Sequence, residues 1–131
     1  FLFIMPISFN VKERGKPGVV GGGEKKFYAN IQFEGEATID ELVKEIEKFS
    51  SLSEPDIRAV VIALENVIQD KLANSRIVRL DKLGSFYPSI SSTGADKAED
   101  VTSKSIKSVN VNYRAGARII NALETGGFKK V

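Results

Sequence analysis

The side chains that most often perform catalysis or bind transition metals are missing from this 131-residue chain, which contains neither histidine nor cysteine. Without thiolates and imidazoles a typical zinc site cannot be built, and disulfides are excluded. The commonest general acid–base residue and the cysteine nucleophile are also missing. Carboxylates and lysines alone can support catalysis, but the composition predicts a protein with no metal, no cofactor and no enzymatic activity.

Two groups of carboxylates and one glycine-rich segment are the remaining motifs that could do chemistry. Residues 40–41 lie where a helix is expected to begin, and the acidic residues of segment 96–100 lie in a polar loop, so helix capping and solvated loop charges account for both. Segment 18–25 has the glycine separation of a phosphate-binding loop, but Glu24 occupies the position of the essential lysine and no helix follows. These motifs favour a binding protein over an enzyme.

Charge is unevenly distributed along the chain, although the net charge is only +2. Residues 1–33 carry a net charge of +3, residues 34–70 carry −7 and residues 71–131 carry +6. An acidic middle between two basic flanks indicates a charged partner on one surface. Ordinary solvated charge is the alternative explanation.

The first residues do not resemble a targeting signal. The apolar run Phe1–Ile4 is short, Pro6 follows closely, and there is no basic start and no cleavage site of the signal-peptide type. We expect the natural start to be Met5, no association with a membrane, and a cytoplasmic location.

The N-terminal segment has the pattern of a β-hairpin. Apolar and polar residues alternate in part over 5–14, glycines punctuate the loop 15–26, and Phe27–Phe33 alternates again. A short basic run on this hairpin could contact DNA or another partner, or could protect an exposed strand edge. Its members are Lys12, Arg14 and Lys16.

Two helices follow the hairpin. The sequence Thr38-Ile39-Asp40-Glu41 predicts a capped helix start, and an apolar stripe continues to Phe49. Ser53 predicts the cap of a second helix over about 54–73, and this helix is apolar over more than half of its circumference. Such a helix requires burial on two sides, so we expect a second subunit to cover it; cover by the N-terminal strands is the alternative.

The remainder of the chain predicts a second β-structure and a last helix. We expect Phe86, Phe49 and Tyr113 to be core aromatic residues, and Gly84 to occupy a turn in which a side chain would obstruct packing. The expected elements are strands at 77–80, 84–90 and 106–113, a polar, projecting segment at 91–105, a helix at about 115–124 and a tail at 128–131.

Five sequence blocks follow one another in a characteristic order and spacing. They are Thr38–Leu42, Leu52-Ser53, Ile77–Leu80, Leu83–Phe86 and Tyr113–Gly116. Their order resembles the bacterial histone-like HU/IHF family, over about residues 37–124. The extra N-terminal hairpin and the C-terminal Gly-Gly-Phe-Lys-Lys resemble the HU-related branch typical of Bacteroidetes.

The resemblance implies an α+β, IHF-like (HU) fold and a function. Two chains would interlock their helices into a dimer body, and a β-sheet would extend as a protruding β-arm from each. Residues 1–36 would form an extension with the extra β-hairpin, and residues 37–131 the HU/IHF-like DNA-binding domain. The expected partner is double-stranded DNA, bound by a homodimer without sequence specificity as a nucleoid-associated, DNA-condensing protein, with no small-molecule substrate.

The residues expected to bind DNA are the lysines and arginines of the arm and of the surface beneath it. Arg114, at the corner between arm and body, is the strongest single candidate. The full set is Arg79, Lys82, Lys97, Lys104, Lys107, Arg114 and Arg118.

The sequence departs from the family at two positions of this surface. The stretch Thr93–Asp100 lacks the wedge proline of the family's arm tip and has three acids against one lysine, while Pro88 is too close to the base of the arm to replace it. Ala117 stands where the family has lysine, next to Arg118. An HU-fold protein-interaction module with weak or lost DNA binding is therefore the alternative function.

Overall fold

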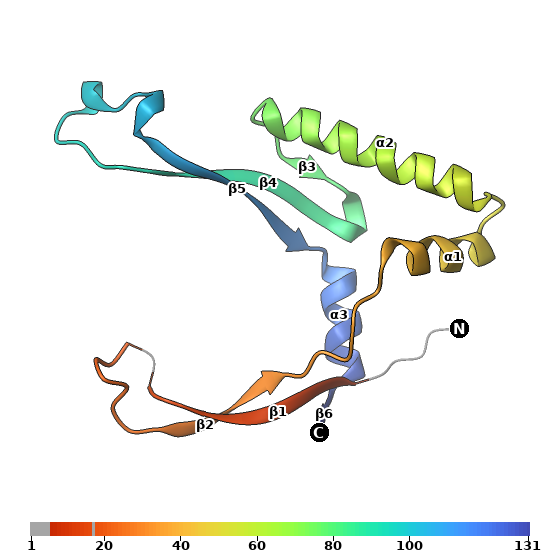
Figure 1. Ribbon diagram of the computed structural model, residues 1–131, viewed down its shortest axis with the longest axis horizontal. Coiled ribbons are helices and arrows are strands. Elements are labelled where there is room, and N and C mark those ends of the chain that lie inside the picture. Colours follow the sequence, from red (N-terminus) through yellow and green to blue (C-terminus); the bar gives the residue numbers. More distant parts are fainter. Residues whose placement is uncertain (1–5, 17) are drawn as a thin grey trace. The chain divides into compact units, whose positions relative to one another are not determined.

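The computed structural model describes residues 6–16 and 18–131 and divides the chain into two units (Figure 1). One unit consists of Phe1–Ala37 together with Ile120–Val131, and the other is Thr38–Ile119. The described residues form three α-helices and two three-stranded sheets, which confirms a mixed α+β protein. The expected start at Met5 falls outside the described residues.

The first unit is a small sheet in which both ends of the chain take part. Strand β1 (Ile7–Arg14) pairs antiparallel with β2 (Lys26–Ile31), as the predicted hairpin requires. Strand β6 (Phe128–Lys130) pairs in parallel with β1 on its other side. The prediction that residues 128–131 are only a tail was wrong, because three of them complete a sheet.

The second unit begins with two capped helices. Helix α1 (Ile39–Phe49) starts after Thr38, whose hydroxyl accepts a hydrogen bond from the Glu41 amide, and α2 (Glu54–Ala73) starts after Ser53. The two helices contact each other, and each contributes one buried side chain from its apolar stripe, Val43 in α1 and Ile57 in α2. Among the described apolar side chains these two alone reach that degree of burial.

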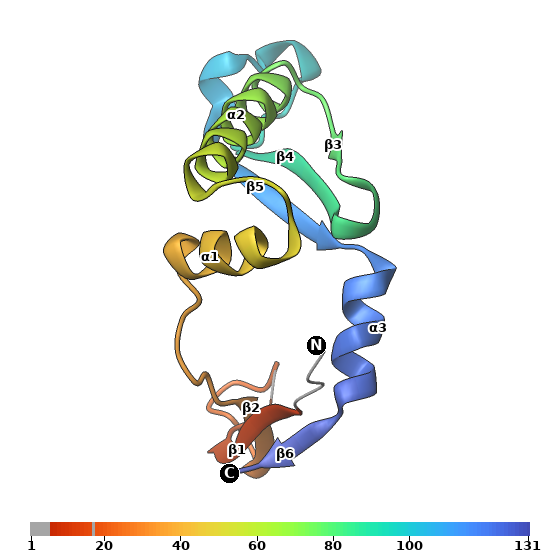
Figure 2. The same ribbon diagram turned by 90° about the vertical axis from the view of Figure 1, so that its right-hand side faces the viewer.

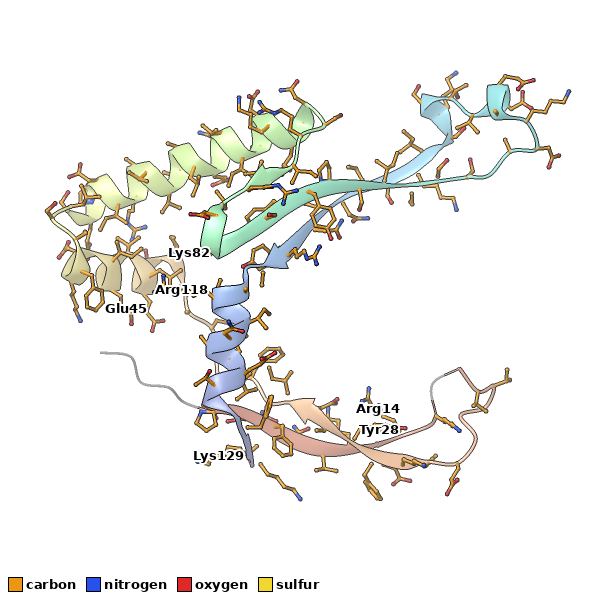
Figure 3. The ribbon with its side chains drawn as sticks, turned by 180° about the vertical axis from the view of Figure 1, so that it is seen from behind. Arg14, Tyr28, Glu45, Lys82, Arg118 and Lys129 are labelled. Carbon is orange, nitrogen blue, oxygen red and sulfur yellow. The ribbon has the colours of Figure 1, made fainter. Side chains whose placement is uncertain are left out.

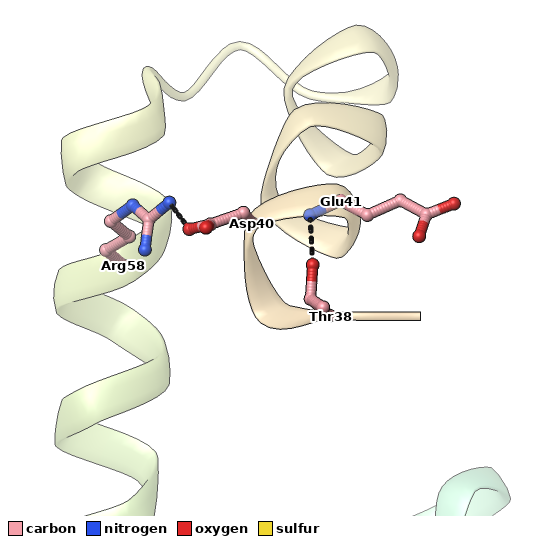
Figure 4. A network of polar contacts seen from close by, with 4 residues as sticks. All are labelled: Thr38, Asp40, Glu41 and Arg58. Carbon is pink, nitrogen blue, oxygen red and sulfur yellow. Dashed lines mark hydrogen bonds and ion pairs between the residues drawn. The ribbon is translucent and has the colours of Figure 1, made fainter. Parts of the chain in front are cut away.

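An ion pair links the first turn of α1 to the second turn of α2. Asp40 at the start of α1 accepts a hydrogen bond from the guanidinium of Arg58 in α2 (Figure 4). The bond and the positive charge of Arg58 lower the pKa of the Asp40 carboxyl below its usual value. The pair also lies near the positive end of the α1 dipole, where a carboxylate is favoured.

Replacing Arg58 by glutamine should raise the pKa of Asp40 towards its usual value. Because the folded-state pKa is lowered, Asp40 stabilises the fold at a pH above its unfolded-state pKa, and this contribution disappears as the pH falls through the folded value. NMR titration of the Asp40 side-chain carboxyl carbon measures the pKa directly, with Arg76→Gln as the control. An unchanged Asp40 titration in Arg58→Gln would show that the pair does not persist in solution.

The second sheet has the order β3-β4-β5. Strand β3 (Val78–Arg79) pairs antiparallel with β4 (Gly84–Ser92), and β4 pairs antiparallel with β5 (Ile106–Ala115). The strands β4 and β5 continue beyond β3 and form a two-stranded arm, whose tip contains short 3-10 turns at Ala98–Asp100 and Ser103–Ser105 (Figure 1). Helix α3 (Ala117–Gly126) follows, two residues later than expected at both ends.

One face of this sheet is apolar and lies beside α2. Its residues alternate along the strands, with Phe86, Pro88 and Ile90 on β4 opposite Tyr113, Val111 and Val109 on β5. Figure 2 shows α2 running alongside these strands. An open apolar groove between them is lined by Val61, Leu64, Glu65, Ile68, Gln69, Leu72, Phe86 and Val111.

Much apolar surface remains exposed on the single chain. The total accessible area of the chain, polar and apolar atoms together, is 11020 Å², against about 6,800 Å² for a compact protein of this mass and about 8,000 Å² for two separate compact units. Phe49 is 62% exposed and Tyr113 is 47% exposed, so the prediction that they are core residues does not hold within one chain. Phe86 is half-buried, and its ring lies 5.2 Å from that of Tyr113.

Gly84 begins β4 in a backbone conformation that other residues avoid. Its φ is 127°, and a Cβ at this position would overlap the carbonyl oxygen of Arg114 and lie 2.9 Å from the Tyr113 ring. The expectation that packing requires glycine here is confirmed. Without a side chain at Gly84, the end of β5 at Arg114 can lie close against the start of β4.

Gly84→Ala should lower the free energy of unfolding by about 3 kcal/mol, through backbone strain together with an overlap that the neighbouring backbone cannot relieve. Gly94→Ala is the matched control, because no atom lies within 4 Å of the added methyl group. Denaturant unfolding of both variants measures the difference. Equal stabilities would show that the β4 start can shift away from Arg114.

Candidate nucleic-acid interface

The second sheet has a polar face opposite the apolar one. On this face a serine lies between two arginines, which come from the two neighbouring strands. Arg79 of β3 pairs with Ser85 of β4, and Ser85 pairs with Arg114 of β5. Directly paired residues of antiparallel strands point to the same face of a sheet. The three side chains therefore share one face, and together with Ile77 and Tyr87 they line a shallow depression.

Neutral polar side chains continue this face along the arm. Asn112 donates a hydrogen bond to the hydroxyl of Ser89 at 2.8 Å, and the hydroxyls of Ser91 and Ser108 lie 2.8 Å apart. No acidic residue belongs to this face in β3, β4 or β5. We call it the polar sheet face, and its residues are Arg79, Ser85, Tyr87, Ser89, Ser91, Ser108, Asn110, Asn112 and Arg114.

Two more predicted cations lie close to this row at the base of the arm. The 3-10 turn Asp81–Leu83 carries Lys82, and its backbone touches Gly116, where an added Cβ would overlap the Lys82 carbonyl oxygen. Gly116 lies two residues from Arg114 and two from Arg118, which is in the first turn of α3. The structure therefore brings four of the seven predicted residues to one region; Figure 3 labels Lys82 and Arg118 there.

The other three predicted cations lie farther out on the arm. Lys107 lies in β5 where the pairing register shifts, and Lys104 lies in the 3-10 turn before it. Lys97 precedes the turn Ala98–Asp100, so it shares the tip with acidic side chains. The tip is thus electrostatically mixed, whereas at the base of the arm the four cations outnumber Asp81, the acidic residue of the turn that carries Lys82.

All seven predicted cations are exposed and available to an external anion. The ion pairs found among residues 6–16 and 18–131 join Arg58 to Asp40 and Lys71 to Asp70, and neither involves a predicted DNA-binding residue. Arginine offers several N–H donors in a planar arrangement that matches the oxygens of a phosphate. Hydroxyl and amide groups also donate to phosphate oxygens, so the polar sheet face can follow a phosphate backbone.

The predicted set of seven contains only lysines and arginines, and it omits the neutral members of the polar sheet face. Their signal is a period of two: Ser85, Tyr87 and Ser89 alternate with the apolar residues of β4. Asn110 and Asn112 alternate with valines in the same way on β5. Attention to charge alone overlooks such residues, because they carry none.

A family model described as an HU domain fused to a wHTH, Ig or glycine-rich motif matches residues 5–130. The chain therefore belongs to this family of HU domains.

A solved structure supports the same fold. It is a crystal structure from Bacteroides vulgatus, provisionally described as a bacterial DNA-binding protein, with a TM-score of 0.64 and 11% sequence identity. The match covers 96% of this chain and 47% of the other, so the chain spans about half of the similar protein's length. No protein of curated function matches the sequence.

The described residues contain neither a membrane-spanning helix nor a cluster of metal ligands. No helix among them combines the length and the apolar character needed to cross a membrane. No group of three or more carboxylates within the described part of the chain is arranged to hold a metal ion.

Proposed function

We propose that this chain is a sequence-tolerant, architectural DNA-binding protein of the bacterial nucleoid that acts as a homodimer. The observation that supports it most strongly is the row Arg79–Ser85–Arg114 on a sheet face without acidic residues. Two arginines and a ladder of hydroxyl and amide donors suit the phosphate backbone. We infer that phosphate contacts, which these groups make whatever the base sequence, would dominate the affinity.

Homodimer formation is inferred from the exposed apolar surface. The total accessible area of the single chain, polar and apolar atoms together, is about 3,000 Å² larger than that of two separate compact units. Burying even a third of this excess on each chain would give an interface of the obligate class. The groove between α2 and the apolar sheet face is the surface that a second copy of α2 would fill.

Binding of duplexes of unrelated sequence tests this function. The logarithm of the association constant should fall linearly with the logarithm of salt concentration, with a slope of about −0.9 for each phosphate contacted. Mobility shifts or fluorescence anisotropy at several salt concentrations measure this slope. If the protein binds no duplex even at low salt, the DNA-binding proposal is wrong.

The tip of the arm supports a second function, that of a protein-interaction module on the HU fold. Asp96, Glu99 and Asp100 would lie against phosphates if the tip entered a DNA groove, and the tip lacks a wedge proline. We therefore propose that DNA is held at the base of the arm without wedge-driven kinking. A loss of DNA affinity on replacing these three acids by glutamine would show instead that the tip contributes.

The proposed role includes no catalysis, is cytoplasmic, and fits an HU-related protein of the Bacteroidetes type.

A further inference from the structure

The N-terminal hairpin has a cationic face of its own. In the register of β1 and β2, Lys12 pairs with Tyr28 and Arg14 pairs with Lys26. These four residues therefore share one face of the sheet. We call this set the hairpin cationic face; Lys129 of β6, paired with Ser8, continues it at the opposite end of β1.

The positive charge of this face is not compensated nearby. Lys12, Arg14 and Lys26 are all exposed, and Glu13 belongs to the opposite face because it pairs with Phe27. Glu34 lies at the far end of the face, where its carboxylate accepts a hydrogen bond of 2.6 Å from Ser8. A surface with three free cations and no adjacent carboxylate on the strands attracts a polyanion.

Tyr28 holds one of these cations in place. The guanidinium carbon of Arg14 lies 4.9 Å from the centre of the Tyr28 ring, and Figure 3 labels the two residues side by side on the hairpin. A cation–π contact orients the guanidinium through its flat face and leaves the N–H groups at its edge free. Those N–H groups can then donate to phosphate oxygens with little further loss of side-chain entropy.

Protection of a strand edge explains this arrangement less well. Lysines that block edge pairing are required near the edge, but they need not all lie on one face. Here the strand cations of the hairpin lie on one face, while the other face is mostly apolar, with Phe9, Val11 and Ile31 beside the single charge of Glu13. Such one-sided segregation is expected when each face meets a different environment.

We propose that the hairpin cationic face is a second contact surface for the phosphate backbone of double-stranded DNA, separate from the polar sheet face. The proposal rests on the proposed DNA-binding function and extends it to the first unit of the chain. Lys12 and Arg14 are two residues apart on one strand, about 7 Å along its axis. They can therefore meet successive phosphates, and Lys26 flanks them on β2.

The test compares the wild-type chain with the triple variant Lys12→Gln/Arg14→Gln/Lys26→Gln. The variant should bind a long duplex of arbitrary sequence at least tenfold more weakly at low salt. Its salt slope should be smaller in magnitude by about 3 for each chain bound, since each lost phosphate contact removes about 0.9. The exposed positions should leave the thermal unfolding midpoint nearly unchanged.

A matched triple variant, Lys44→Gln/Lys48→Gln/Lys71→Gln, removes the same charge from α1 and α2. It should retain the wild-type DNA affinity and salt slope, apart from the small change that a lower net charge causes. If the wild-type binds DNA and the two triple variants bind equally well, the second contact surface does not exist, although the proposed function stands. If the hairpin variant loses binding only to vesicles of anionic phospholipid, the face serves a membrane and the inference is overturned. If the wild-type binds no duplex, both proposals fail.

Discussion

The double variant Arg79→Gln/Arg114→Gln is expected to reduce affinity for duplex DNA by about 100-fold or more at low salt. The two arginines are cross-strand neighbours of Ser85, so one duplex backbone passing over the polar sheet face would meet both. In a homodimer the substitution removes four phosphate contacts. The salt slope should therefore decrease in magnitude by about 4 if a dimer binds and by about 2 if a single chain binds.

Anisotropy titrations with one labelled duplex at several salt concentrations measure both quantities. The control Lys44→Gln/Lys48→Gln carries the same change in net charge, on the exposed face of α1. It should shift the affinity only slightly. An Arg79/Arg114 variant that binds as tightly as this control would remove the main support for DNA binding and would favour the protein-interaction module.

Much of the secondary structure could be predicted because local chemistry determines it. Thr38 and Ser53 are N-cap residues in the structure, as their positions before apolar stripes indicated. The four cations near the base of the arm were also identifiable, because they flank the Leu-Gly-Ser-Phe and Tyr-Arg-Ala-Gly blocks. The contact between Lys82 and Gly116 that brings them together was not identifiable, since it joins residues 34 positions apart.

Long-range pairing was the part that sequence patterns could not provide. Strand β6 is only Phe128–Lys130, too short for an alternation pattern to distinguish it from a tail. Its partner is β1, at the other end of the chain. A three-residue strand is stabilised by that pairing and not by its own propensity, so no local signal could reveal it.

The exposed aromatic residues show a different limit. Phe49 and Tyr113 have the sequence pattern of core residues, but in one chain Phe49 is largely exposed and Tyr113 is about half exposed. Periodicity indicates which face of an element is to be buried, and it does not indicate which molecule covers that face. The difference between predicted and observed burial is therefore itself evidence for the proposed second subunit.

Leu64→Glu is expected to abolish the proposed dimer and, with it, cooperative unfolding. Leu64 lines the groove between α2 and the sheet and is 43% exposed in the single chain, so a second copy of α2 would complete its burial. An unpaired carboxylate in an apolar interface costs several kcal/mol, and it would be present twice in a symmetric dimer. Because Val43 and Ile57 are the only apolar side chains that are buried within the described part of one chain, a separated monomer would have little core left.

Light scattering at micromolar concentration measures the mass, and thermal scans at two protein concentrations measure the coupling between assembly and stability. For the wild-type we expect the mass of a dimer and an unfolding midpoint that rises with protein concentration. Asn66→Glu places the same carboxylate on α2 outside the groove and should preserve both properties. A monomeric wild-type chain with a sharp, concentration-independent transition would show that the apolar face of α2 is covered in some other way, and the argument from exposed surface to a second subunit would fail.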